Sequence, residues 1–155
     1  MAHEHPSRIL RPASSPAPSP SDKAPAQQAL TFLRKQLPPS IDVSLPQARV
    51  FVRTTATVLG WQGDIETAAH TAAALVRNAA DCTRESFCLG LAVDAEGSLL
   101  IEVEDGERVF ADADHVARLL FFLTGARVSW VATVDGRVVR AVMPMRQAVR
   151  AGGVA

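Results

Sequence analysis

Alternation of apolar with small or polar residues is the clearest pattern in the chain, and it occurs in its second half. Phe87 to Val93 and Leu99 to Val103 alternate in this way, with a glycine-containing turn between them. Residues 128–134 and 138–143 alternate again, and the Asp135-Gly136 dipeptide that joins them favours a tight hairpin turn. The pattern therefore predicts two antiparallel β-hairpins.

Helical spacing of apolar residues dominates the first half. It predicts a short amphipathic helix over 26–37 that Pro38 and Pro39 stop, and a helix from about Ala48 to Leu59 that Ser44 caps and Pro46 opens. Between these two, residues 41–44 alternate briefly and suggest a short strand.

Two further helices are expected. One runs from Asp64, a good N-cap, to about Asp81, and its alanines allow close packing against a sheet. The other runs from Asp112 to Thr124 and ends at Gly125. The hairpins and helices together predict an α+β two-layer sandwich, in which an antiparallel or mixed sheet carries helices on one face.

The domain boundaries follow from composition. Residues 1–25 hold most of the ten prolines together with Ser and Ala, which predicts a disordered tail. Residues 26–40 form the short helix and a linker, 41–145 the folded domain, and 146–155 a flexible C-terminal tail.

Charge and hydropathy reduce the number of function classes to consider. Sixteen basic and sixteen acidic residues cancel and lie interspersed, which argues against direct nucleic-acid binding. No apolar run approaches the length of a membrane span and the start lacks a signal-peptide pattern, so we expect a cytoplasmic protein without membrane contact. Cys82 and Cys88 lack metal-site spacing and are expected to be reduced.

Three segments carry a resemblance to a known family. Ala48-Arg49-Val50-Phe51-Val52-Arg53 resembles the first helix of the bacterial anti-sigma regulatory factors, which belong to the GHKL, or Bergerat-fold, histidine-kinase-like ATPases. Ala74 to Ala79 resembles the family's N box, and Val103-Glu104-Asp105 resembles the strand end that carries its adenine-binding Asp. The order of the predicted elements agrees with this resemblance from about Ile41 to Pro144.

The resemblance implies an ATP site with Mg²⁺. Asn78 takes the place of the N-box Asn that ligates Mg²⁺, and Asp105 takes that of the Asp that accepts a hydrogen bond from the adenine amino group. Gly106 follows directly, so Asn78, Asp105 and Gly106 are the candidate nucleotide-binding residues. A carboxylate four residues before the Asn would share its helix face and act as the general base, but Ala74 occupies that position.

The chain departs from the family at two further points. The family often has a glycine two residues after the Asp, where this chain has Glu107. The segment between Phe110 and Ala117 contains no glycine to bring backbone N–H groups to phosphates, and carries Asp112 and Asp114 instead. His115 lies nearby and could substitute as a base, but a single His without an orienting partner is more often a surface residue or a residue near a helix start.

These departures favour a regulatory protein of the anti-sigma-factor type that acts by protein–protein binding without catalysis. Its expected partner is a sigma factor or an anti-sigma antagonist, and a homodimer is compatible with the pattern. The alternatives are an ATP-dependent protein serine kinase, a regulator that binds ATP without hydrolysing it, and a small chaperone or adaptor unrelated to ATP.

Overall fold

Five strands and two long helices are the main elements of the residues that the structure describes. The computed structural model describes residues 30–106, 118, 120–121 and 124–145. Along the chain the elements are β1 (Leu33–Leu37), α1 (Ile41–Val58), α2 (Ile65–Cys82), β2 (Phe87–Val93), β3 (Leu99–Asp105), β4 (Arg127–Ala132) and β5 (Arg137–Met143).

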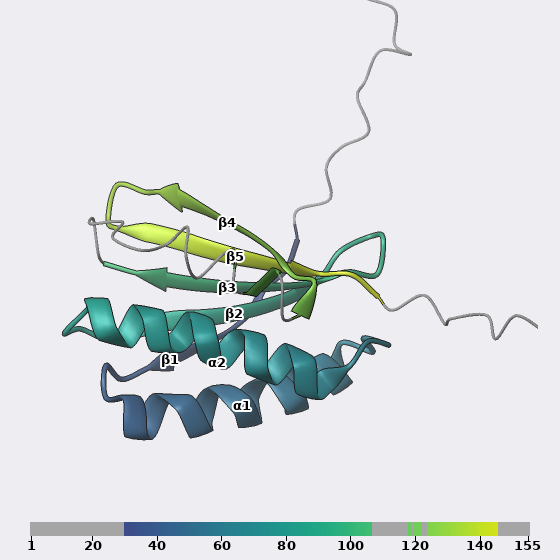
Figure 1. Ribbon diagram of the computed structural model, residues 1–155, viewed down its shortest axis with the longest axis horizontal. Coiled ribbons are helices and arrows are strands. Elements are labelled where there is room, and N and C mark those ends of the chain that lie inside the picture. The colour runs from purple at the N-terminus through teal and green to yellow at the C-terminus, as the bar shows by residue number, and fades with distance from the viewer. Residues whose placement is uncertain (1–29, 107–117, 119, 122–123, 146–155) are drawn as a thin grey trace, which may run out of the picture.

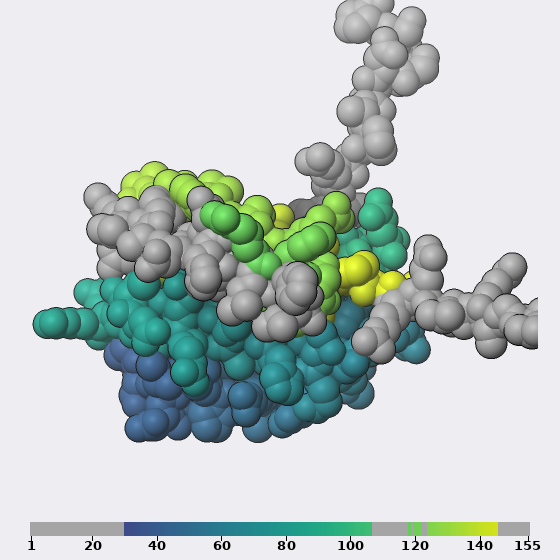
Figure 2. All heavy atoms as spheres, in the orientation of Figure 1, coloured from purple at the N-terminus to yellow at the C-terminus, as the bar shows by residue number. Residues whose placement is uncertain are grey.

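The strands form a single antiparallel sheet in the order β1-β2-β3-β5-β4. Both helices lie on the same face of this sheet, and they run side by side below it in Figure 1. The space-filling view shows α1 and α2, in blue and teal, as the lower part of the molecule (Figure 2). The predicted α+β two-layer sandwich is thereby confirmed.

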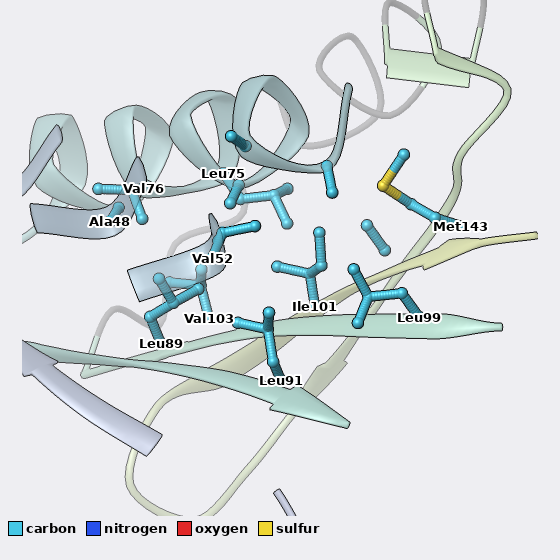
Figure 3. Close-up of a cluster of buried hydrophobic side chains, with 14 of the residues drawn as sticks. Ala48, Val52, Leu75, Val76, Leu89, Leu91, Leu99, Ile101, Val103 and Met143 are labelled. Atoms are coloured by element: carbon cyan, nitrogen blue, oxygen red, sulfur yellow. The ribbon is translucent and has the colours of Figure 1, made fainter. Parts of the chain in front are cut away.

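The core lies between the helices and the sheet. Strand residues in one alternating phase, such as Leu89, Leu91, Ile101 and Val103, point toward α1 and α2 (Figure 3). Small residues face them from α2, which carries seven alanines and can therefore approach the sheet closely. Leu75 from α2 is buried at the centre of this cluster.

The opposite face of the sheet carries a charged network. Arg34 on β1 donates to Glu104 on β3 at 3.2 Å, and Arg140 on β5 pairs with Glu102 on β3. Phe32 lies under the guanidinium groups of Arg34 and Arg140, whose carbons are 5.6 and 5.8 Å from its ring centre. Because these contacts join β1, β3 and β5, they link strands that are not all neighbours in the sheet.

Two predictions about the first part of the domain are wrong. Residues 33–37, which we assigned to an amphipathic helix over 26–37, form β1, because Leu33 to Leu37 pair with the edge of β2. Residues 41–44, expected as a strand, are the first turn of α1, whose N-cap is Ser40. Ser44 is therefore not the cap, and Pro46 lies inside the helix. The part of the predicted helix before residue 30 lies outside the described residues.

The other element predictions fare better. Helix α2 begins after Asp64, whose side chain accepts the N–H of Thr67 at 3.1 Å, as predicted. Both hairpins are confirmed. Of the predicted helix 112–124, residues 118, 120, 121 and 124 are described and helical. The tails predicted for 1–25 and 146–155 lie outside the described residues. Within the described part of the chain, neither helix has the length and hydropathy needed to cross a bilayer.

Candidate functional site

The residues predicted to hold a nucleotide gather at one end of the sandwich. Asn78 lies near the C-terminal end of α2, four residues of connecting chain separate α2 from β2, and Cys88 at the start of β2 lies opposite Glu104. The end of β3 that carries Asp105 therefore lies at the same end of the molecule as the end of α2 (Figure 1).

Asp105 forms a buried ion pair with a residue that the sequence analysis did not single out. The Nε atom of Arg137 lies 3.1 Å from both carboxylate oxygens of Asp105. The side chains are 1% exposed for Asp105 and 0% for Arg137, so the pair is removed from water. The positive charge of the Arg137 guanidinium group therefore lies directly against the negative charge of the Asp105 carboxylate.

The register of the sheet produces this pair. Asp105 on β3 lies directly opposite Arg137 on β5, and both side chains follow the phase of the core-facing residues of their strands. Gly136 brings β5 into this position: a Cβ atom added there would lie 2.7 Å from the Cα of Gly106 and 2.9 Å from the carbonyl carbon of Asp105. Only a residue without a side chain allows that approach.

The remaining predicted site residues are less constrained. Ala74, at the general-base position, is half-buried and packs against the core, so it offers no proton-accepting group. Asn78 is half-buried. Gly106 is exposed, and a Cβ there would meet only ordinary contacts, the nearest being 3.9 Å from Asp135 and from Glu85. The segment with Asp112, Asp114 and His115 lies outside the described residues.

Acidic groups surround this end of the sheet. A pocket of about 260 Å³ is lined by residues that include Glu104, Asp105, Gly106 and Asp135. These carboxylates offer no cation to a triphosphate, and the Asp105 carboxylate already binds Arg137. The carboxylate that the resemblance assigns to adenine is thus engaged by a guanidinium group in this structure.

A second hollow lies on the helix pair. It measures about 560 Å³ and is lined by residues of α1 and by Arg77 of α2, and we call it the arginine groove. Its lining comprises Ile41, Asp42, Leu45, Pro46, Arg49, Val50, Arg53 and Arg77. An apolar hollow of the same volume adjoins it on α1 and shares Pro46 and Val50 with it.

The three arginines of the groove differ in their partners. Arg53 donates to both carboxylate oxygens of Glu66 at 2.8 and 2.9 Å, and this hydrogen bond raises the pKa of Arg53 and lowers that of Glu66. Within the described residues, no carboxylate pairs with Arg49 or Arg77. The groove thus combines two unpaired positive charges with exposed apolar surface, since Val50 is 61% exposed. The four-residue spacing of Arg49 and Arg53 on one helix face was the sequence signal for it.

Other residues considered from the sequence have ordinary roles. His70 is exposed, and its Nδ1 lies 2.8 Å from the carbonyl oxygen of Glu66. Trp61 is buried in the core, whereas Trp130 is 39% exposed on the edge strand β4. Cys82 and Cys88 are free thiols. Among the described residues, no cluster of His, Cys, Asp and Glu could hold a metal ion.

The sequence was also compared with known proteins. It matches no family model, and it matches none of the curated proteins.

Proposed function

We propose that this chain is a regulatory protein of the anti-sigma-factor type that binds another protein through the arginine groove and performs no catalysis. The observation that carries the proposal is the pair of unpaired arginines, Arg49 and Arg77, beside exposed apolar residues on the helix pair. A groove of this kind is suited to a peptide segment, because its apolar residues can bury apolar side chains of the peptide. Its charges would fix the position at which the peptide binds.

The chemistry of the groove specifies the partner. Exposed guanidinium groups bind carboxylates in a two-pronged geometry, so the segment that enters should carry Asp or Glu beside apolar residues. Asp42 at the rim would repel a carboxylate next to it and so limit how the segment is oriented. A sigma factor or an anti-sigma antagonist with such a segment is the proposed partner, which places the chain in the cytoplasm.

Absence of catalysis is supported by the state of the predicted ATP site. A kinase of this family would need a carboxylate four residues before Asn78, and Ala74 is a methyl group packed against the core. Loss of a general base costs roughly two to four orders of magnitude in rate. The kinase alternative therefore has less support than binding alone.

The test is a defined pairwise binding experiment. Each sigma factor and anti-sigma antagonist encoded by the source organism would be purified and titrated against the fluorescently labelled full chain. We expect one of them to bind saturably, with an affinity that falls as salt rises, because exposed charges are screened. A double charge reversal, Arg49→Glu with Arg77→Glu, should abolish that binding.

A matched control variant tests whether charge reversal anywhere on the surface would weaken the binding. Arg84 is exposed, lies after α2 and does not line the groove, so Arg84→Glu should leave the affinity unchanged. Binding that survives the double reversal, or that Arg84→Glu weakens equally, would move the interface away from the groove. If no sigma factor or antagonist binds the unmodified chain, the regulatory proposal itself fails.

A further inference from the structure

We propose that the open edge of β1 binds an extended acidic segment of a partner protein as an additional strand. The apolar hollow on α1 that adjoins the arginine groove, which we call the edge hollow, would receive side chains of that segment. The groove arginines that carry the proposed function are not part of this surface, so the two proposals can fail separately.

The first observation is that β1 has a free backbone edge. It is the first strand in the order β1-β2-β3-β5-β4, and residues 33–37 all pair with β2. Among the residues that the structure describes, no backbone hydrogen bond reaches the other side of β1. Open N–H and C=O groups along a strand are a template for the addition of a further strand.

The edge hollow lies beside this free edge. It measures about 560 Å³ and is lined by Lys35 of β1 and by α1 residues that include Val50, Phe51 and Thr54. Figure 1 shows β1 at the edge of the sheet that lies nearest α1. Lys35 lies opposite Leu89 and so has the alternating phase that faces the helices. Every second side chain of an added strand would therefore point toward the hollow.

The charges of β1 indicate which segment can be added. Lys35 is half-buried beside apolar residues, and within the described part of the chain no carboxylate pairs with it. Arg34, on the opposite face, already pairs with Glu104. A partly buried charge is screened less by salt than an exposed one, so Lys35 favours a carboxylate opposite it. The segment should thus carry an acidic residue between two apolar residues of the same phase.

The same charges argue against a second copy of this chain as the occupant. Strand β1 contains Arg34 and Lys35 and no acidic residue. Full overlap of two antiparallel β1 strands would bring Lys35 opposite Lys35, and like charges directly opposite each other destabilise a sheet. A charged residue in an inward phase is one of the ways in which edge strands avoid self-association. An acidic strand turns that repulsion into attraction.

The test uses the full unmodified chain and fluorescently labelled synthetic peptides in anisotropy titrations. The probe is Val-Thr-Glu-Thr-Val, capped at both ends, which can place Glu opposite Lys35 in either strand direction. We expect it to bind saturably, and we expect Val-Thr-Lys-Thr-Val to bind at least about tenfold more weakly. Absence of saturable binding by the acidic peptide, or equal affinity for both peptides, would overturn the proposal.

Backbone pairing is tested by N-methylation of the peptide, which leaves the protein unchanged. The N–H groups of successive residues in a strand point to opposite sides. Methylation of both Thr residues and methylation of Glu with both Val residues should therefore differ, since one pattern blocks pairing with β1 and the other is tolerated. Equal effects of the two patterns would exclude strand addition.

Variants of the chain locate the site. Thr54 is exposed and lines the edge hollow but not the arginine groove, so Thr54→Trp should fill the hollow and prevent saturable binding of the acidic peptide. Its matched control is Thr57→Trp, at an exposed position of α1 outside both hollows. Lys35→Glu should weaken binding, whereas Arg127→Glu on the other edge strand should not. Equal effects of test and control variants would place the peptide elsewhere. A dimer of the unmodified chain that Thr54→Trp dissociates would assign the edge to a second copy and overturn the proposal.

Discussion

Substitution of Gly136 gives a sharp test of how closely the last hairpin approaches β3. In Gly136→Ala the new methyl group would overlap the carbonyl oxygen of Asp105 and lie 2.7 Å from the Cα of Gly106. These obstacles are backbone atoms, so no side-chain rotation relieves the overlap. Overpacking of this kind costs about 1–3 kcal/mol when side chains can adjust. With backbone as the obstacle, we expect a loss of about 3 kcal/mol or more.

The assay is equilibrium unfolding in urea, followed by the fluorescence of the buried Trp61. The control is Gly60→Ala, because Gly60 has a φ of 69° and no atom within 4 Å of an added Cβ. That control isolates the backbone cost of a left-handed residue, about 1 kcal/mol. If Gly136→Ala is no more destabilising than Gly60→Ala, the hairpin does not press on β3 and the geometry of the Asp105–Arg137 pair is wrong.

Three further predictions concern the helices. Asp64→Ala removes the side-chain acceptor at the start of α2 and should cost about 1 kcal/mol in urea unfolding; an unchanged midpoint would show that the cap contributes nothing. Leu75→Ala should cost about 2–5 kcal/mol because Leu75 is fully buried, whereas Val50→Ala, at an exposed position, should change the stability by about 0.5 kcal/mol at most; equal losses would contradict the assigned core. Arg53 lowers the pKa of Glu66, so this pair stabilises the fold at neutral pH and ceases to do so as the pH falls below the ordinary glutamate range. The stability difference between the unmodified chain and Glu66→Gln should therefore shrink in acid, and a difference that persists there would exclude the ion pair as its cause.

Local sequence signals were sufficient wherever the structure depends on neighbours in the chain. The hairpin of β2 and β3 needs only alternation and a turn, and α2 needs an apolar stripe and an N-cap at Asp64. Their interactions are short in sequence, so a single sequence carries them. The side of the sheet that the helices cover followed from the same phase of apolar residues.

The first strand shows where local reasoning fails. Leu30, Leu33 and Leu37 have helical spacing, but Leu33, Lys35 and Leu37 equally fit the alternation of a strand. Pairing with β2 decides between them, since Leu37 lies opposite Phe87 and is fully buried. That partner is 50 positions away in the sequence, so no local pattern could show that β2 has a free edge to offer.

Only part of the candidate site could be predicted, again because the missing part depends on pairing between distant strands. The position of Asp105 at the end of a strand could be read from the sequence, but its partner could not be assigned without the register between β3 and β5. A signal was present: Arg137 lies in the same alternating phase as Val139 and Met143, which face the core. A charge in an apolar phase calls for an opposite charge nearby, and Asp105 breaks the apolar phase of β3 in the same way.

The buried Asp105–Arg137 pair and the arginine groove lie in different parts of the same scaffold, and this separation has a consequence. Asp105 and Arg137 lie on the sheet, on the face that the helices cover, whereas Arg49 and Arg77 line a groove between the two helices. Charge reversal in the groove removes no core contact, because Arg49 and Arg77 are exposed. Loss of partner binding in the Arg49→Glu, Arg77→Glu variant should therefore occur with an unchanged unfolding midpoint. A large drop in that midpoint would mean that the groove arginines support the fold and that the binding result cannot be assigned to recognition.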